Sequence, residues 1–212
     1  ISDDGSTDGT IQFLKQIKNK KIKIFFQKHN LGIFGNLQFL NLKAKTSIIK
    51  ILCGDDYLQK NSLKHINLFM QKNKSCHVLT CFDQLSRKHP TLKILSKIGG
   101  KPYLKFTPKS SMVAFFAFGN ICGNLSRVTY RKSINNKNPV FNHKYPYAGD
   151  YDTWVRFSKK YGFYLLKKNL VYVKRHMKQS SHVLNKKNDL YPQLSKIYIF
   201  LLKNINKNTI FN

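Results

Sequence analysis

Apolar residues in the first part of the chain alternate between helical spacing and strand-like runs. Stripes with a period of about 3.6 residues predict helices near residues 11–17, 37–42 and 60–72. Short runs rich in β-branched and aromatic residues predict strands at residues 21–27, 48–52 and 78–82. This alternation predicts an α/β fold, with a mostly parallel sheet flanked by helices and joined by right-handed crossovers.

The pattern weakens after residue 83. Three prolines and the pair Gly99-Gly100 interrupt residues 83–111, which predicts irregular structure or a hairpin. Residues 112–118 are apolar without a helical period, so their state stays open. The remaining predicted elements are a strand at 125–130, a helix at 153–161, one or two strands at 163–173 and a terminal helix at 192–204.

The length of 212 residues suits a single domain with a sizeable core. The longest apolar stretch, residues 112–118, is far shorter than the ~20 residues of a membrane-spanning helix. The terminal helix is apolar and flanked by lysines, so it would either pack on the domain or lie on a membrane surface. No initiator Met precedes Ile1, and we expect a fragment that lacks its first strand and helix.

The chain is strongly basic, with 38 Lys and Arg, 9 acidic residues and a formal charge of +29. Only five of the cations are Arg, the better reader of bases and phosphates, and no nucleic-acid-binding signature is present. We therefore predict no nucleic-acid partner, while attraction to anionic lipids or phosphate-bearing acceptors stays open. The four cysteines lack paired spacing and indicate a reducing compartment, hence a cytoplasmic protein with an optional peripheral membrane association.

The acidic residues are grouped rather than scattered. All nine are Asp, and seven of them fall in three clusters, at residues 3–8, 55–56 and 150–152. Grouped carboxylates repel one another unless they share a cation or a proton. We therefore expect the three clusters to converge on one site.

The middle cluster, Gly54-Asp55-Asp56, follows an apolar run that resembles a buried strand. In open α/β sheets, ligands bind outside the carboxyl ends of strands. Paired Asp side chains there suit Mg²⁺ or Mn²⁺, which usually also hold substrate phosphates. The alternative interpretation is a plain turn, because Gly-Asp-Asp also favours turns.

Three motifs together resemble the family 2 glycosyltransferases of the GT-A fold. Residues 3–10, DDGSTDGT, resemble the nucleotide-binding loop, and Gly54-Asp55-Asp56 resembles the DxD-type metal motif. Residues 148–154, AGDYDTW, resemble the acceptor-side motif, with Gly149 replacing the usual acid before the base. Asn30, Gly32 and Asn36 also match, as does the late segment of His176 and Ser180.

The resemblance implies an inverting transfer from a nucleotide-sugar donor, commonly a UDP-sugar, with a divalent metal. Asp150 would be the base that activates the acceptor hydroxyl. Asp56 would ligate the metal, with His176 as a further metal or diphosphate contact. The implied substrate-binding residues are Asp3, Asp4, Ser6, Asn30, Gly32, Asn36, Asp55, Asp152 and Trp154. Asp152 could instead be an acid in the first turn of a helix, where the helix dipole favours negative charge. Trp154 could instead be an anchor of the hydrophobic core.

The resemblance also divides the chain and leaves rival functions open. It implies one catalytic domain over residues 1–212, with a nucleotide-binding half at about 1–82, an acceptor half at about 112–182 and a C-terminal helix at about 192–205. The acceptor would be a glycan or a lipid-linked molecule, in surface polysaccharide synthesis. The rivals are a metal-dependent nucleotidyltransferase of related fold, a non-catalytic basic binding module and an inactive paralogue.

Overall fold

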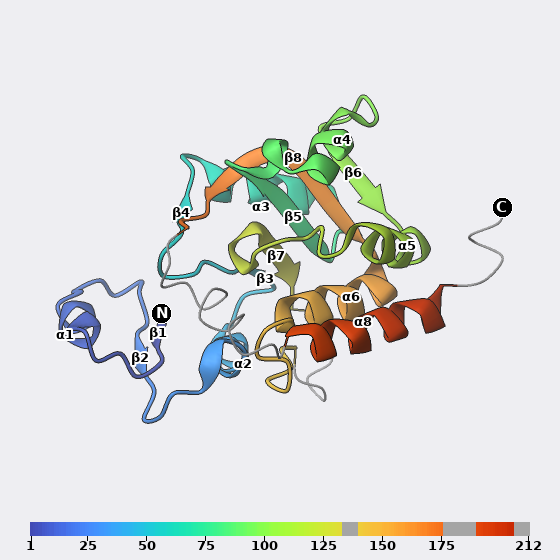
Figure 1. The fold of residues 1–212 in the computed structure, drawn as a ribbon. Helices are drawn as coiled ribbons and strands as arrows, with labels where there is room; N and C mark the ends of the chain where they lie inside the picture. Colours follow the sequence, from blue (N-terminus) through green and yellow to red (C-terminus); the bar gives the residue numbers. More distant parts are fainter. Residues whose placement is uncertain (133–139, 176–189, 206–212) are drawn as a thin grey trace.

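The computed structural model describes residues 1–132, 140–175 and 190–205, and it contains two separate sheets (Figure 1). The smaller sheet pairs β1 (Ser2–Asp3) in parallel with β2 (Phe25–Phe26). Helix α1 (Thr10–Lys15) connects these two strands. The predicted strand at residues 21–27 is therefore much shorter than its apolar run, because only two of its residues find a partner strand.

The larger sheet has the order β3-β7-β5-β8-β4, with β6 also paired to β8. Its strands are β3 (Ile48–Lys50), β4 (Tyr57–Leu58), β5 (Val78–Asp83), β6 (Tyr103–Phe106), β7 (Val128–Arg131) and β8 (Phe163–Tyr172). Within it only β5 and β8 are parallel, and the other four pairings are antiparallel. The sheet is thus mixed, where the alternation of elements predicted a mostly parallel one, because β7 inserts antiparallel between β3 and β5.

Helices cover both faces of this sheet, as the α/β prediction required. Residues of β5 alternate between two core clusters: Val78 and Phe82 face one, and Leu79 and Cys81 face the other. Helix α3 (Ser62–Lys72) packs Ile66 and Met70 on the second cluster. Helices α5 (Pro108–Phe118), α6 (Gly149–Tyr161) and α8 (Leu190–Asn204) pack on the first. A strand buried on both faces suits the centre of such a fold.

The segment predicted to be irregular is instead well organised. It forms a short 3₁₀ turn, η1 (Ser86–Lys88), helix α4 (Pro90–Lys97) and strand β6, and it leads into α5. Pro90 and Pro108 occupy the first turns of α4 and α5, where a missing N–H costs nothing. Thr107 and Ser110 add a reciprocal capping box to α5. The prediction read these prolines as breakers, and it was wrong because they begin helices.

Helix α8 packs on the domain, as one of its two predicted roles required. It buries Ile197 and Leu201 against the core and leaves Ile199 and Leu202 about half exposed. None of the helices in the described ranges has the length and apolar content needed to cross a bilayer.

Candidate active site

Hydrogen bonds within the first acidic loop use its carboxylates to shape the backbone. Asp3 is buried, and its Oδ1 accepts from the backbone N–H groups of Gly5 (3.1 Å) and Ser6 (3.0 Å). The side-chain hydrogen bond from Ser6, followed by these backbone bonds, holds the pKa of Asp3 below its usual value. Asp3 is thus ionised at neutral pH and fixes the turn that follows β1.

A second set of bonds ties this loop to helix α2 (Gly32–Lys43). Asp4 Oδ1 accepts from the backbone N–H of Leu31 (2.8 Å), and Asn30 Oδ1 accepts from that of Gly32 (2.9 Å). Asn36 Nδ2 donates to the backbone oxygen of Ser2 (3.2 Å). The residues predicted as one nucleotide-binding set therefore do lie together, around the N-terminus of α2.

The Asp55-Asp56 pair lies between β3 and β4, where the polar turn was predicted. Asp56 is buried, and its Oδ1 accepts from the backbone N–H of Lys174 (3.0 Å). Its Oδ2 is buried and has no hydrogen-bond partner among the described residues. Burial raises the pKa of this carboxyl above its usual value. An ionised oxygen buried without a partner is costly, unless a ligand completes it.

Residues next to this pair are hydrogen-bonded to the short 3₁₀ helix η2 (Leu125–Arg127). Cys53 N donates to Ser126 Oγ (2.8 Å), and Lys50 Nζ donates to the backbone oxygens of Ile51 (3.0 Å) and Ser126. Burial lowers the pKa of Lys50 to about 8. Lys50 was not predicted as a site residue, because in the sequence it is not distinct from the many surface lysines of this chain.

Asp150 is the second residue of α6 and lines a cavity of about 480 Å³. Its Oδ2 accepts from Asn120 Nδ2 (3.1 Å), and its Oδ1 accepts from the backbone N–H of Tyr151 (2.7 Å). Burial outweighs these bonds and raises the pKa of Asp150 to about 6. At neutral pH the group is thus mostly ionised, yet basic enough to take a proton.

Gly149, the first residue of the helix that carries Asp150, lies close to helix α2. A Cβ at Gly149 would lie 2.6–2.9 Å from ring atoms of Phe34, in helix α2. The close approach explains why no acid stands before Asp150 here. The same contact brings α6 against α2, the helix to which the first acidic loop is hydrogen-bonded.

Six further polar residues that were not predicted line the Asp150 cavity, namely Asp83, His89, Asn120, Asn124, Arg127 and Arg175. Arg127 is buried, its Nε donates to the backbone oxygen of Cys81 (2.7 Å), and its Nη2 has no partner within the described part of the chain. The scarcity of Arg in the sequence was a usable signal for Arg127. Asp83 Oδ1 accepts from Leu85 N and Ser86 Oγ, and it shapes the turn after β5.

Of the second and third acidic clusters only Asp150 lines the cavity among the described residues, and Asp56 is linked to the cavity wall through residue 174. The backbone N–H of Lys174 bonds Asp56, and its chain neighbours Val173 and Arg175 line the Asp150 cavity. The first cluster belongs to the small sheet, and helix α2 links it to α6. None of its residues is among the described residues that line the Asp150 cavity, so the predicted convergence of all three clusters stays a prediction. Within the described ranges no group of three His, Cys, Asp or Glu side chains is arranged to hold a metal ion.

The other predicted site residues are placed differently. Asp152 pairs with Arg156 Nε at 2.8 Å, one turn along α6, which matches its alternative role as a first-turn helix acid. Trp154 is fully buried and packs edge-on against Phe141 and Phe157, so it has no surface to offer a ligand. His176 and Ser180 lie outside the described residues.

Most of this chain is similar to a known protein. The chain is 25% identical over 192 residues to an uncharacterised glycosyltransferase of Haemophilus influenzae, covering 87% of this chain and 58% of that protein. The chain therefore spans little more than half the length of that relative.

Solved structures share the fold. The crystal structure of Staphylococcus aureus TarS has a TM-score of 0.60 and 20% identity, covering 83% of this chain and 30% of TarS. Residues 1–349 of TarS in complex with UDP-GlcNAc give the same score and identity over 82% of this chain and 49% of that one. The likeness shows that this chain has the GT-A-type fold of TarS.

The family itself is shown by sequence. The sequence model of glycosyl transferase family 2 matches residues 1–124, more than half of the chain and including the first two acidic clusters. With this match, the chain belongs to glycosyl transferase family 2.

Proposed function

We propose that the protein is an inverting glycosyltransferase, which moves a sugar from a nucleotide-sugar donor to a hydroxyl of a glycan or lipid-linked acceptor. The observation that carries the proposal is Asp150, a half-buried carboxylate with a pKa raised to about 6. It lines a cavity that also includes Val173 and Arg175, the chain neighbours of the residue whose backbone binds Asp56. A base with a pKa near the operating pH combines ionisation with proton affinity. The complex of TarS with UDP-GlcNAc supports a UDP-sugar as donor.

Asp150 would act on the acceptor. As the acceptor oxygen forms its bond to the anomeric carbon, the bond from that carbon to the diphosphate oxygen breaks on the opposite face. The hydroxyl proton passes to Asp150, whose two oxygens are held by Asn120 and by the backbone N–H of Tyr151. Fixed hydrogen bonds orient the carboxylate before reaction, which lowers the cost of reorganisation.

Asp55 and Asp56 would face the leaving group. The Oδ2 of Asp56, buried without a partner among the described residues, fits a hard cation such as Mg²⁺ or Mn²⁺. Such an ion neutralises charge on a departing diphosphate. Two carboxylates suffice when substrate phosphates complete the ligand set, and His176 stays a predicted third ligand.

The first acidic loop would bind the nucleotide. Asp3 and Asp4 hold its turn and its bond to Leu31, and a carboxylate can accept a hydrogen bond from a uracil N–H. Ser6, Asn30, Gly32 and Asn36 belong to the same bonded group and would border the donor. We propose a role in surface polysaccharide synthesis in the cytoplasm, a reducing compartment in which the four free cysteines would persist.

The test uses the full-length protein with UDP-, GDP- and dTDP-sugars, with and without Mn²⁺. Calorimetry identifies the donor, and NMR of the glycoside product reads the anomeric configuration. We expect an inverted product, and an Asp150→Asn variant slower by about 10²- to 10⁴-fold with donor affinity unchanged. Asp152→Asn is the matched control and should keep most of the rate, because Asp152 is paired with Arg156.

Two results would contradict the proposal. A product with retained configuration would exclude direct displacement, and full activity of Asp150→Asn would exclude this base. Transfer of a nucleotidyl group in place of the sugar would favour the nucleotidyltransferase alternative.

A further inference from the structure

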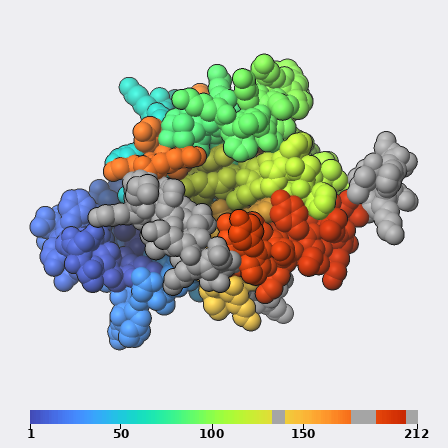
Figure 2. All heavy atoms as spheres, in the orientation of Figure 1, coloured from blue at the N-terminus to red at the C-terminus, as the bar shows by residue number. Residues whose placement is uncertain are grey.

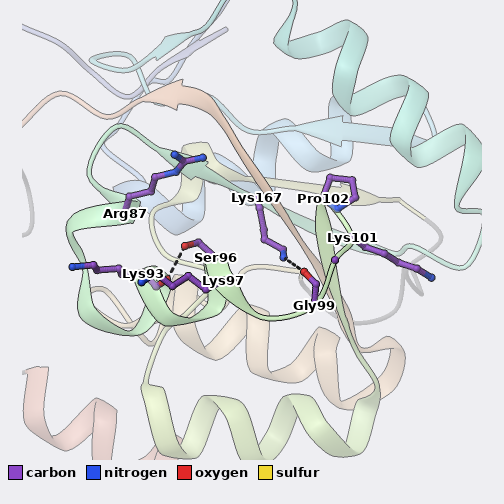
Figure 3. A pocket seen from close by; sticks show the side chains of 9 residues that line it. Arg87, Lys93, Ser96, Lys97, Gly99, Lys101, Pro102 and Lys167 are labelled. Carbon is purple, nitrogen blue, oxygen red and sulfur yellow. Dashed lines mark hydrogen bonds between the residues drawn. The ribbon is translucent and has the colours of Figure 1, made fainter.

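A second cavity, of about 630 Å³, lies on another side of helix α4 from the Asp150 cavity (Figure 3). Five of its nine lining residues are cationic, and none is acidic. The cationic residues are Arg87, Lys93, Lys97, Lys101 and Lys167. We call this surface the α4 basic surface, and it forms the upper edge of the molecule in the green region of Figure 2.

Hydrogen bonds satisfy only part of this charge. Lys167 Nζ donates to the backbone oxygens of Ile98 (2.6 Å) and Gly99 (3.1 Å), and it thereby holds the loop after α4. The one ion pair found among the described residues is between Arg156 and Asp152, elsewhere in the fold. Arg87, Lys93, Lys97 and Lys101 are exposed and like-charged around one hollow. This arrangement raises a local positive potential that an anionic partner would relieve.

Two large apolar side chains are exposed among these cations. Ile94 is 62% exposed, and it lies between Lys93 and Lys97 along the exposed side of α4. Ile98 is 49% exposed and immediately precedes the glycine pair that lines the cavity. A helix that presents cations and isoleucines together is typical of the interface of a lipid bilayer, where both kinds of group find partners. A soluble phosphate would contact the cations and leave the isoleucines in water.

We propose that the α4 basic surface docks on an anionic lipid bilayer. The cations of this surface would contact the phosphate headgroups, and Ile94 and Ile98 would enter the boundary between headgroups and acyl chains. The inference rests on exposed charge and apolar area, and it requires no transfer activity. It would also locate the proposed reaction relative to the membrane, because His89 and Leu92, at the start of the same helix, line the Asp150 cavity. Docking would hold that cavity close to the bilayer.

The test is co-sedimentation of the full-length protein with vesicles of phosphatidylcholine, with or without phosphatidylglycerol. A triple variant, Lys93→Ser, Lys97→Ser and Lys101→Ser, removes three exposed cations of the surface. The matched control removes three exposed cations elsewhere, as Lys15→Ser, Lys18→Ser and Lys20→Ser. Each cation near an anionic surface contributes about fivefold in affinity, so we expect a loss of about 100-fold in the first triple variant. The control should lose less than about threefold, because its charges would not reach the lipid.

A second variant tests the apolar part. Ile94→Ser with Ile98→Ser should weaken vesicle binding by at least about tenfold, and the loss should persist at high salt, where the cations are screened. Circular dichroism of every variant confirms folding, which is expected because all five substituted side chains of this surface are exposed.

Several outcomes would overturn the proposal. Equal losses in the two triple variants would mean that only total charge matters. Vesicle binding that depends on Ile199 and Leu202 of α8 would place the contact on the terminal helix. Tight binding of inorganic pyrophosphate that the first triple variant abolishes, without an effect on vesicles, would assign the surface to a soluble phosphate. Donor binding and transfer are measured separately without vesicles, so failure here is distinguishable from failure of the proposed function.

Discussion

The first acidic loop and the Asp56–Asp150 region use the same side chain in opposite ways. In the loop, Asp3 receives hydrogen bonds that hold its pKa below the usual value. Asp56 and Asp150 are taken out of water, and burial raises the pKa of both. Hydrogen bonds from its own loop keep Asp3 charged, whereas burial gives Asp56 and Asp150 a higher affinity for a proton.

This difference predicts opposite contributions to stability at neutral pH. Asp3 stabilises the fold there, because its charged form is favoured in the folded chain. Asp56 and Asp150 destabilise it at neutral pH, because their charged form is favoured in the unfolded chain. Sites that do chemistry commonly carry such a cost.

The substitution with the largest expected effect tests whether the first acidic loop and the Asp150 region are in rigid contact through helices α2 and α6. Gly149→Ala would place a methyl group against the ring of Phe34, so helix α2 and the loop bonded to it must move away from α6. Overpacking of this kind lowers the free energy of unfolding by about 1–3 kcal/mol. Urea denaturation measures it, with Gly100→Ala as the control because no atom lies within 4 Å of its added Cβ. Equal stability of the two variants would contradict a rigid contact between α2 and α6.

The next prediction concerns the pH dependence of transfer. With a pKa of about 6, Asp150 loses its capacity to accept a proton as the pH falls through that value. The kcat/KM for donor and acceptor should therefore fall about tenfold below its plateau at pH 5. A rate profile that stays level between pH 5 and pH 7 would show that a different group limits the reaction.

A pair of identical substitutions compares the two kinds of carboxylate directly. Asn keeps an acceptor oxygen and removes the charge, so Asp3→Asn should lower the free energy of unfolding at pH 7 by about 1 kcal/mol or less. Asp56→Asn should leave stability unchanged or raise it, because its charge is disfavoured by burial.

The contrast between these two variants should also depend on pH. Asp3 has a lowered pKa, so its stabilisation is present above pH ~3.8 and is lost as the pH falls below it. Thermal unfolding at pH 7 and at lower pH measures both variants. Stability changes of the same sign at pH 7 would contradict the comparison.

The smallest effect is expected at Asp152. Its ion pair with Arg156 joins residues one turn apart on a partly exposed helix face. Such pairs contribute about 0.3–0.5 kcal/mol, so Asp152→Asn should be close to neutral in thermal unfolding. A loss several times larger would indicate a role beyond this pair.

Much of the first half of the fold could be predicted from spacing, and the acidic clusters indicated a candidate site. The α/β class is confirmed, and helix α3 and strand β5 lie close to their predicted ranges. Helix α2 begins earlier than predicted, so Gly32 and Asn36 lie within it and not in a loop. The segment of α4 and β6 could not be predicted, because Pro90 and Pro108 begin helices as readily as they end them. Asn120 was also missed, since only its position beside Asp150 distinguishes it from the other asparagines of the chain. Arg127 was missed although arginines are scarce in the sequence.

The sequence by itself determined many elements of the first half and the candidate chemistry, because apolar periodicity and grouped aspartates are local properties of a chain. It could not determine the mixed sheet, since strand direction depends on which distant partner, here β7 between β3 and β5, completes the ladder. Nor could it separate Asp3 from Asp150. Hydrogen bonds favour the charged form of one and burial disfavours that of the other, and burial exists only after residues far apart in sequence have packed together.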